Sequence, residues 1–258
     1  MSPSLLRERH GRAALLAATD DHPYIAYDVP DALAEDWWEV DGAVAFRRRR
    51  QARPVLALLG SDAGVAELVD LLPELATRSG ARDGRRSAVG VSLPQHLEPL
   101  LHQRFRIGAG GDWEWFYTTT APAASAERQR VVPLDDVARR EEVVDFLAEH
   151  SPTADTAPCG GEQWVAVEGQ GGRLAAVAAL GRTPAGAPHI SSVAVAATLR
   201  GQGLGRTIVG ALTRSAVLSE GVCTLGMYSD NAVARNLYHS LGYDNPCSWA
   251  SRAVALSA

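Results

Sequence analysis

The chain has no excess of basic residues, few cysteines and no long apolar run. Its 258 residues carry a formal net charge of −5, which argues against a dominant nucleic-acid-binding face. The three cysteines, Cys159, Cys223 and Cys247, have no metal-ligand spacing, and their odd number does not form a disulfide framework. No apolar run approaches the roughly 20 residues that a membrane-spanning helix needs. We therefore expect no nucleic-acid partner, no membrane and no metal.

The N-terminal segment also lacks a targeting signal. In "MSPSLLRERHGRAALLAA" charged residues interrupt the apolar ones, so the apolar core of a signal peptide is missing. Free cysteines suit a reducing compartment, and we expect a soluble, cytoplasmic protein. The one dense basic run, 47–50, is short and is typical of a solvated strand end or loop.

The length and one weakly patterned segment predict two domains. A chain of this length exceeds a typical single domain. The segment "TTTAPAASAERQR" is rich in small residues and contains Pro122, as linkers do. We therefore predict an N-terminal α/β domain at 1–117, a linker at 118–130 and a second domain at 131–258.

The second half alternates helical and strand patterns. A helix is predicted from the apolar spacing in 135–150, and further helices at 206–221 and 231–243. Strands are predicted at 163–169, 173–181, 189–197, 222–229 and 248–256. This order describes a mixed α/β layer.

The first half repeats part of this order. Strands at 53–60, 87–92 and 112–120 alternate with helices at 62–80 and 94–105. The strand–helix–strand–helix–strand order also describes 189–256, so the first half is a candidate degenerate internal repeat. The alternative is that two unrelated α/β segments share a common order.

The segment "LRGQGLGRT" at 199–207 contains three alternating glycines between Arg200 and Arg206. It fits neither the P-loop pattern nor the dinucleotide fingerprint, because the spacing of its glycines fails both. A glycine turn between a strand and a helix still forms an anion site, since backbone N–H groups and the helix dipole face the same point. A turn that holds no ligand is the alternative.

Two segments together resemble a known family. Val193, Val195, Arg200, Gly201, Gly203 and Gly205 follow the acetyl-CoA signature V-x-V-x-x-x-x-R-G-x-G-x-G of the GNAT N-acetyltransferase superfamily. The segment "NAVARNLYHSLGY" at 231–243 resembles the second motif of that superfamily. Ala197 departs from the proline that many relatives carry. The resemblance covers about 130–258 and implies a GNAT acyl-CoA N-acyltransferase fold, arranged as a tandem of a degenerate first domain and an intact second one.

The resemblance also implies ligand contacts. The backbones of Val193 and Val195 would bind the pantetheine arm of acetyl-CoA, and the run Arg200, Gly201, Gln202, Gly203, Leu204, Gly205, with Arg206, would hold its pyrophosphate. Asn231 would add a cofactor contact, or would act only as a helix N-cap. Tyr238 would protonate the departing thiolate, with a half-buried packing role as its alternative.

The base that deprotonates the amine is left open by the sequence. His189, Glu162 and Asp155 are candidates, and so is a water chain. The predicted activity is acetyl transfer from acetyl-CoA to a primary amine of a small molecule or peptide, by a monomer or homodimer. A non-catalytic acyl-CoA-binding sensor or interaction module is the alternative.

Overall fold

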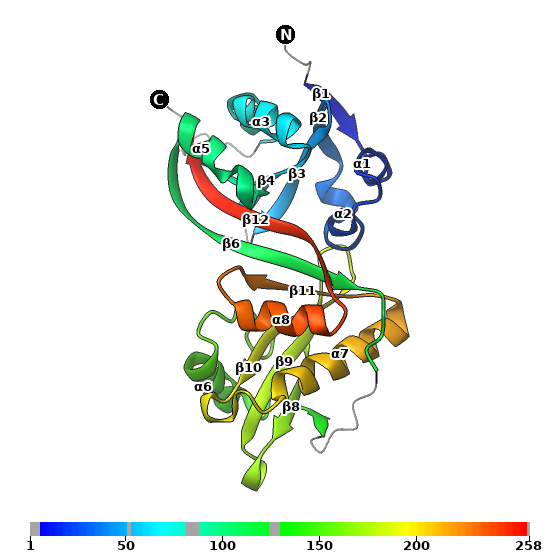
Figure 1. The fold of residues 1–258 in the computed structure, drawn as a ribbon, viewed down its shortest axis with the longest axis vertical. Coiled ribbons are helices and arrows are strands. Elements are labelled where there is room, and N and C mark those ends of the chain that lie inside the picture. The colour runs from blue at the N-terminus through cyan, green and yellow to red at the C-terminus, as the bar shows by residue number, and fades with distance from the viewer. Residues whose placement is uncertain (1–5, 51–52, 81–87, 124–129, 257–258) are drawn as a thin grey trace. The chain divides into compact units, whose positions relative to one another are not determined.

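The computed structural model describes residues 6–50, 53–80, 88–123 and 130–256. They form two compact units, coloured along the chain in Figure 1. The first unit consists of Met1–Glu114, Tyr228–Asp230 and Pro246–Ala258, and the second of Trp115–Met227 and Asn231–Asn245. Residues 124–129 of the predicted linker lie outside the described residues. The predicted domain boundaries stay a prediction.

The first unit contains a mixed sheet with the strand order β1-β2-β3-β4-β5-β12-β6. Strand β4 pairs parallel with β5, whereas the pairs β1–β2, β2–β3, β3–β4 and β5–β12 are antiparallel. Its elements are β1 (Arg7–His10), α1 (Arg12–Ala18), α2 (Pro23–Asp28), β2 (Asp36–Val40), β3 (Ala43–Arg50), β4 (Arg53–Gly60), α3 (Asp62–Asp70), α4 (Leu72–Arg78), β5 (Ala88–Pro94), α5 (Glu98–Arg104) and β6 (Arg106–Thr118).

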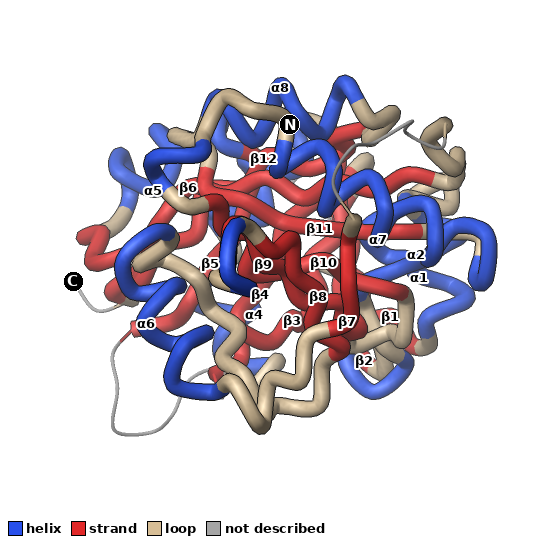
Figure 2. The backbone as a smooth tube through the Cα atoms, turned by 90° about the horizontal axis from the view of Figure 1, so that it is seen from below, coloured by secondary structure: helices blue, strands red, loops and turns tan. Residues whose placement is uncertain are grey.

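The second unit continues from the end of β6 with the order β6-β11-β10-β9-β8-β7. Figure 2 shows β8, β9 and β10 running side by side. The elements are β7 (Val131–Pro133), α6 (Arg140–His150), β8 (Gln163–Glu168), β9 (Leu174–Arg182), β10 (Pro188–Val195), α7 (Leu204–Glu220), β11 (Cys223–Tyr228) and α8 (Ala232–Ser240); the chain then returns to the first unit in β12 (Asp244–Ala255). The mixed α/β class predicted from the sequence is confirmed.

Two predicted helices differ from the observed ones for local reasons. The single helix predicted at 62–80 is two helices, α3 and α4, because Pro73 has no N–H to continue the hydrogen-bond ladder of α3. The helix predicted at 135–150 begins only at Arg140. The carboxylate of Asp135 accepts the N–H groups of Val137 and Ala138 and holds these residues in a turn.

Both faces of the sheet in the second unit are covered. Alternate residues of β8 point to opposite faces, so Val165 packs with α7 and α8, whereas Trp164 packs with α6. Helix α7 contributes an apolar stripe that includes Ile208, Leu212 and Ala216. No described helix is long and apolar enough to cross a membrane.

The last strands of the two similar segments are exchanged. The order β4-α3-α4-β5-α5-β6 matches β10-α7-β11-α8-β12 apart from the divided helix. However, β5 pairs with β12, from Trp249↔Pro94 to Ala255↔Ala88, and β11 lies beside β6. The sheet of each unit is therefore completed by the last strand of the other segment. Strand β12 completes the first unit, and the end of β6 completes the second.

Candidate functional site

Strand β10 is paired with β9 along one edge, except at a bulge between Ser191 and Ala194, and is paired with β11 along only part of the other edge. Toward β9 its register runs from Pro188↔Arg182 to Val195↔Ala176. Toward β11 the described residues pair only at His189↔Thr224 and Ile190↔Leu225. The edge from Ser191 to Val195 thus presents backbone N–H and C=O groups that no strand satisfies, and an extended ligand could pair with them. Val193 and Val195 lie in this segment.

The glycine turn leads from β10 into α7. Gly201 and Gly203 have φ values of 77° and 85°, and no atom lies within 4 Å of the position that a Cβ would occupy at either residue. Glycine is required here by the left-handed backbone, and the space beside the turn is open. Gly205 differs, because its Cβ position lies 3.4 Å from the Leu237 side chain of α8.

Helix α7 begins without a side-chain cap. Its N-cap is Gly203, and the first intrahelical bond runs from the Thr207 N–H to the Gly203 carbonyl, at 3.0 Å. The N–H groups of the first turn are therefore left for a ligand, at the positive end of the helix dipole. An anion fits this site.

Both arginines of the turn are held by hydrogen bonds. Arg200 donates to the carbonyls of Val195, at 3.4 Å, and His150, at 2.8 Å. Arg206 donates to the Ser240 hydroxyl of α8, at 2.5 Å. Both residues remain exposed, as does Gln202, so two positive charges lie at the start of α7.

Asn231 and Tyr238 lie on helix α8. The Asn231 side chain accepts the Ala234 N–H at 3.0 Å, which is the N-cap contact that the sequence predicted. Tyr238 is 6% exposed, and its ring packs edge-on against Phe116, with centroids 5.6 Å apart. Burial raises the pKa of the Tyr238 phenol to about 12. The phenol is thus a proton donor at neutral pH.

The candidate bases lie in different places. His189 is at the paired end of β10, where its Nδ1 lies 2.9 Å from the Thr224 hydroxyl. Glu162 lines a pocket of about 480 Å³ with Pro188 and with Ser215 and Glu220 near the end of α7. Since Ser215 to Glu220 lie 11 to 16 residues after Leu204, where α7 begins, this pocket lies roughly 16 to 24 Å along the helix from the glycine turn. The structure therefore does not bring Glu162 to the turn.

Ser192 is a residue that the sequence pattern did not single out. It lies in a bulge of β10, has a left-handed φ of 49° and is buried. Its hydroxyl bonds the backbone of Thr156 in the loop after α6. In "HISSVAV" a serine fits ordinary strand alternation, so no local signal marks the bulge.

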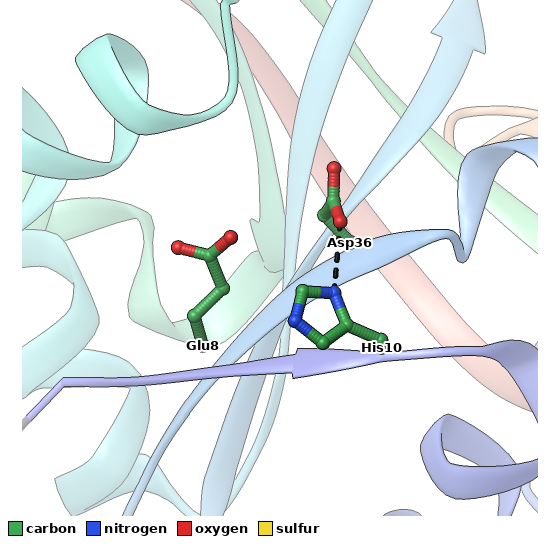
Figure 3. Close-up of side chains that lie close together, drawn as sticks. All are labelled: Glu8, His10 and Asp36. Atoms are coloured by element: carbon green, nitrogen blue, oxygen red, sulfur yellow. Dashed lines mark hydrogen bonds and ion pairs between the residues drawn. The ribbon is translucent and has the colours of Figure 1, made fainter.

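Among the residues of the first unit that the structure describes, one group of side chains could act as metal ligands. Glu8, His10 and Asp36 lie close together on β1 and β2 (Figure 3), with ligand atoms within 4.8 Å of one another. Arg47 pairs with Asp36 at 3.0 Å and Arg78 approaches Glu8 at 3.9 Å. These arginines compensate both carboxylates, so we interpret the group as a surface ion-pair network.

The partly unpaired strand, the glycine turn and the capped helix α8 define an acetyltransferase-type α/β domain. Residues 132–243 match the model of the Acetyltransferase (GNAT) family. The resemblance expected from the sequence is confirmed.

Solved structures support the same fold. A GCN5-related N-acetyltransferase from Sphaerobacter thermophilus is 14% identical, with a TM-score of 0.52 over 100% of this chain and 97% of that one. An acetyltransferase of the GNAT family from Colwellia psychrerythraea is 12% identical, with a TM-score of 0.52 over 97% of this chain and 99% of that one. No curated protein sequence matches the chain.

Proposed function

We propose that the protein transfers the acetyl group of acetyl-CoA to a primary amine of a small molecule or peptide. The observation that carries this proposal is the edge of β10 that is unpaired from Ser191 to Val195 and leads directly into the open glycine turn. An extended pantetheine arm can pair with this edge at Val193 and Val195. The pyrophosphate then reaches the first N–H groups of α7.

The residues of the turn fit a pyrophosphate. Gly201 and Gly203 leave open space where side chains would block it. Arg200 and Arg206 add positive charge, and Gln202 offers an exposed amide. Asn231 caps α8, and we propose that it also contacts acetyl-CoA. The acyl donor, when bound, supplies a thioester carbonyl to a neutral amine.

Tyr238 acts as the general acid. The amine nitrogen forms a bond to the carbonyl carbon, the carbon–sulfur bond breaks, and Tyr238 gives its proton to the sulfur. The raised pKa of Tyr238 keeps the phenol protonated at neutral pH. His189 is the candidate base nearest in sequence to the unpaired edge, and we assign it the amine proton, directly or through water.

Release of the CoA thiol with a panel of primary amines tests the activity. We expect Tyr238→Phe to lower kcat by about 10²-fold, the typical contribution of general acid catalysis, with little change in the KM for acetyl-CoA. Tyr27→Phe, in α2 of the first unit, is the control and is expected to retain full activity. CoA binding without tyrosine-dependent turnover of any amine would instead support a non-catalytic acyl-CoA sensor.

A further inference from the structure

The loop that joins α6 to β8 is attached to β10 at two points. Arg200, after β10, donates to the carbonyl of His150 at the end of α6 and also to the carbonyl of Val195. Ser192 then bonds Thr156, six residues further along the loop. The two attachments lie at the two ends of the β10 segment from Ser192 to Val195. The loop from 151 to 156 therefore runs alongside this segment, whose edge toward β11 is unpaired.

The Ser192 attachment uses one hydroxyl for two bonds. The Thr156 N–H donates to Ser192 Oγ at 3.1 Å, and the same hydroxyl donates to the Thr156 carbonyl at 2.9 Å. Both backbone groups of one loop residue are therefore fixed to β10. A serine with a φ of 49° costs about 1 kcal/mol or more of backbone strain, which glycine would avoid. The strained residue at this position thus supplies a hydroxyl that glycine could not.

Asp155 immediately precedes this attachment. It is exposed, and it is the one charged side chain between Ser151 and Gly161. Among the described residues it makes no ion pair and no side-chain hydrogen bond. The positive charges of the site, Arg200 and Arg206, lie at the other end of the unpaired segment. The unpaired segment therefore has two arginines at the glycine turn, and at its other end Asp155 is one residue before the Thr156 backbone that Ser192 holds.

A carboxylate in this place has a specific consequence for the acceptor. The amine that attacks the thioester must be neutral, so it gains little from an ion pair with Asp155. A second, positively charged group on the same molecule does gain from one. We propose that Ser192 is a positioning residue that holds Asp155 beside the unpaired edge of β10. Asp155 in turn binds the second charge of an acceptor that carries two amino groups. The inference rests on the proposed function.

Binding to the full chain in the presence of CoA gives a test that needs no turnover. Isothermal titration with 1,4-diaminobutane and 1-aminobutane should give about two- to fivefold tighter binding of the diamine, the size of one exposed ion pair. Asp155→Asn should abolish this preference. Asp145→Asn, which removes the same charge from the exposed face of α6, should retain it.

Kinetics and hydrogen exchange test the role of Ser192. Ser192→Gly relieves the backbone strain but removes both bonds, so it should fold normally, raise the KM for the diamine and leave kcat unchanged. The Thr156 amide should exchange faster in this variant. Ser219→Ala, whose hydroxyl bonds only carbonyls of its own helix, should change neither quantity.

The outcomes separate this inference from the proposed function. A diamine preference that depends on Asp155, in a chain that acetylates no amine, supports the inference and contradicts the proposed function. Equal binding of the two amines overturns the inference even if both are acetylated. An equal loss of kcat for both amines in Asp155→Asn also overturns it, because that result identifies Asp155 as the base.

Discussion

Tyr238 combines two properties that usually conflict in a tyrosine. It is packed against Phe116 in the core of the second unit, yet the proposed function requires its hydroxyl as a proton donor. Burial reconciles the two properties, because it disfavours the phenolate and raises the pKa to about 12. The proton stays on the oxygen at the alkaline pH values where amines become neutral.

The same pKa shift predicts a change in stability with pH. In the unfolded chain a tyrosine titrates near pH 10, whereas Tyr238 in the folded chain titrates at about 12. The folded state binds this proton more tightly, so its contribution to stability is complete below pH 10 and is lost as the pH rises toward 12. Between pH 8 and pH 11 the free energy of unfolding of the parent chain falls. We expect it to fall by about 1 kcal/mol less in Tyr238→Phe, because this variant lacks the titrating phenol.

Urea unfolding at the two pH values measures this difference. Leu237→Met changes packing on the same helix without changing an ionisable group, so it should lose as much stability between pH 8 and pH 11 as the parent chain. An unchanged pH dependence in Tyr238→Phe would contradict the shifted pKa.

The turn between β10 and α7 makes a prediction about glycine. Gly203 and Gly171, which lies in the turn between β8 and β9, both have left-handed φ values and open space at the Cβ position. Alanine at either site should cost about 1 kcal/mol in the free energy of unfolding. Only Gly203→Ala should also raise the KM for acetyl-CoA, by about tenfold, because only this Cβ occupies the proposed pyrophosphate site.

Thermal unfolding and steady-state kinetics of both variants measure the two effects. Equal values of the KM for acetyl-CoA in Gly203→Ala and Gly171→Ala would contradict the prediction, because they would show that Gly203 is needed only for the backbone conformation of the turn.

Elements with strong local signals were predicted from the sequence, and elements without them were not. The strands and helices from β8 to α8 follow clear periodicity and end at glycines such as Gly221 and Gly242, which have positive φ values. The elements before β4 and the short strand β7 were missed. The Asn231 cap was predicted because Asn is a typical N-cap, whereas the Ser192 bond to Thr156 joins residues 36 positions apart. No local pattern encodes such a contact.

The pairing of β12 with β5 could not be predicted either, since the two strands lie far apart in the sequence. It makes the first unit dependent on the C-terminal residues. Ala250 and Val254 of β12 are part of the first unit's core, and without β12 an edge of β5 would lose its backbone partners. We predict that removing residues 246–258 will unfold the first unit and leave the second partly protected.

Hydrogen exchange resolved by peptide measures this effect. Amides of β5, including Val91 and Leu93, should lose protection in the shortened chain, whereas amides of β9 should exchange much more slowly than those of β5. Ala253→Ser, a mild change at a partly buried position of β12, is the control. Retained protection of β5 in the shortened chain would contradict the prediction.

The exchanged strands also set the order of events during synthesis. The ribosome makes β5 well before its partner β12, because β6 to α8 lie between the two strands in the sequence. Until then the first sheet has an open edge, which is a site for wrong pairing with another chain. The first unit therefore cannot complete its sheet until the elements of the second unit have been made, and its folding depends on a contact of very long sequence separation.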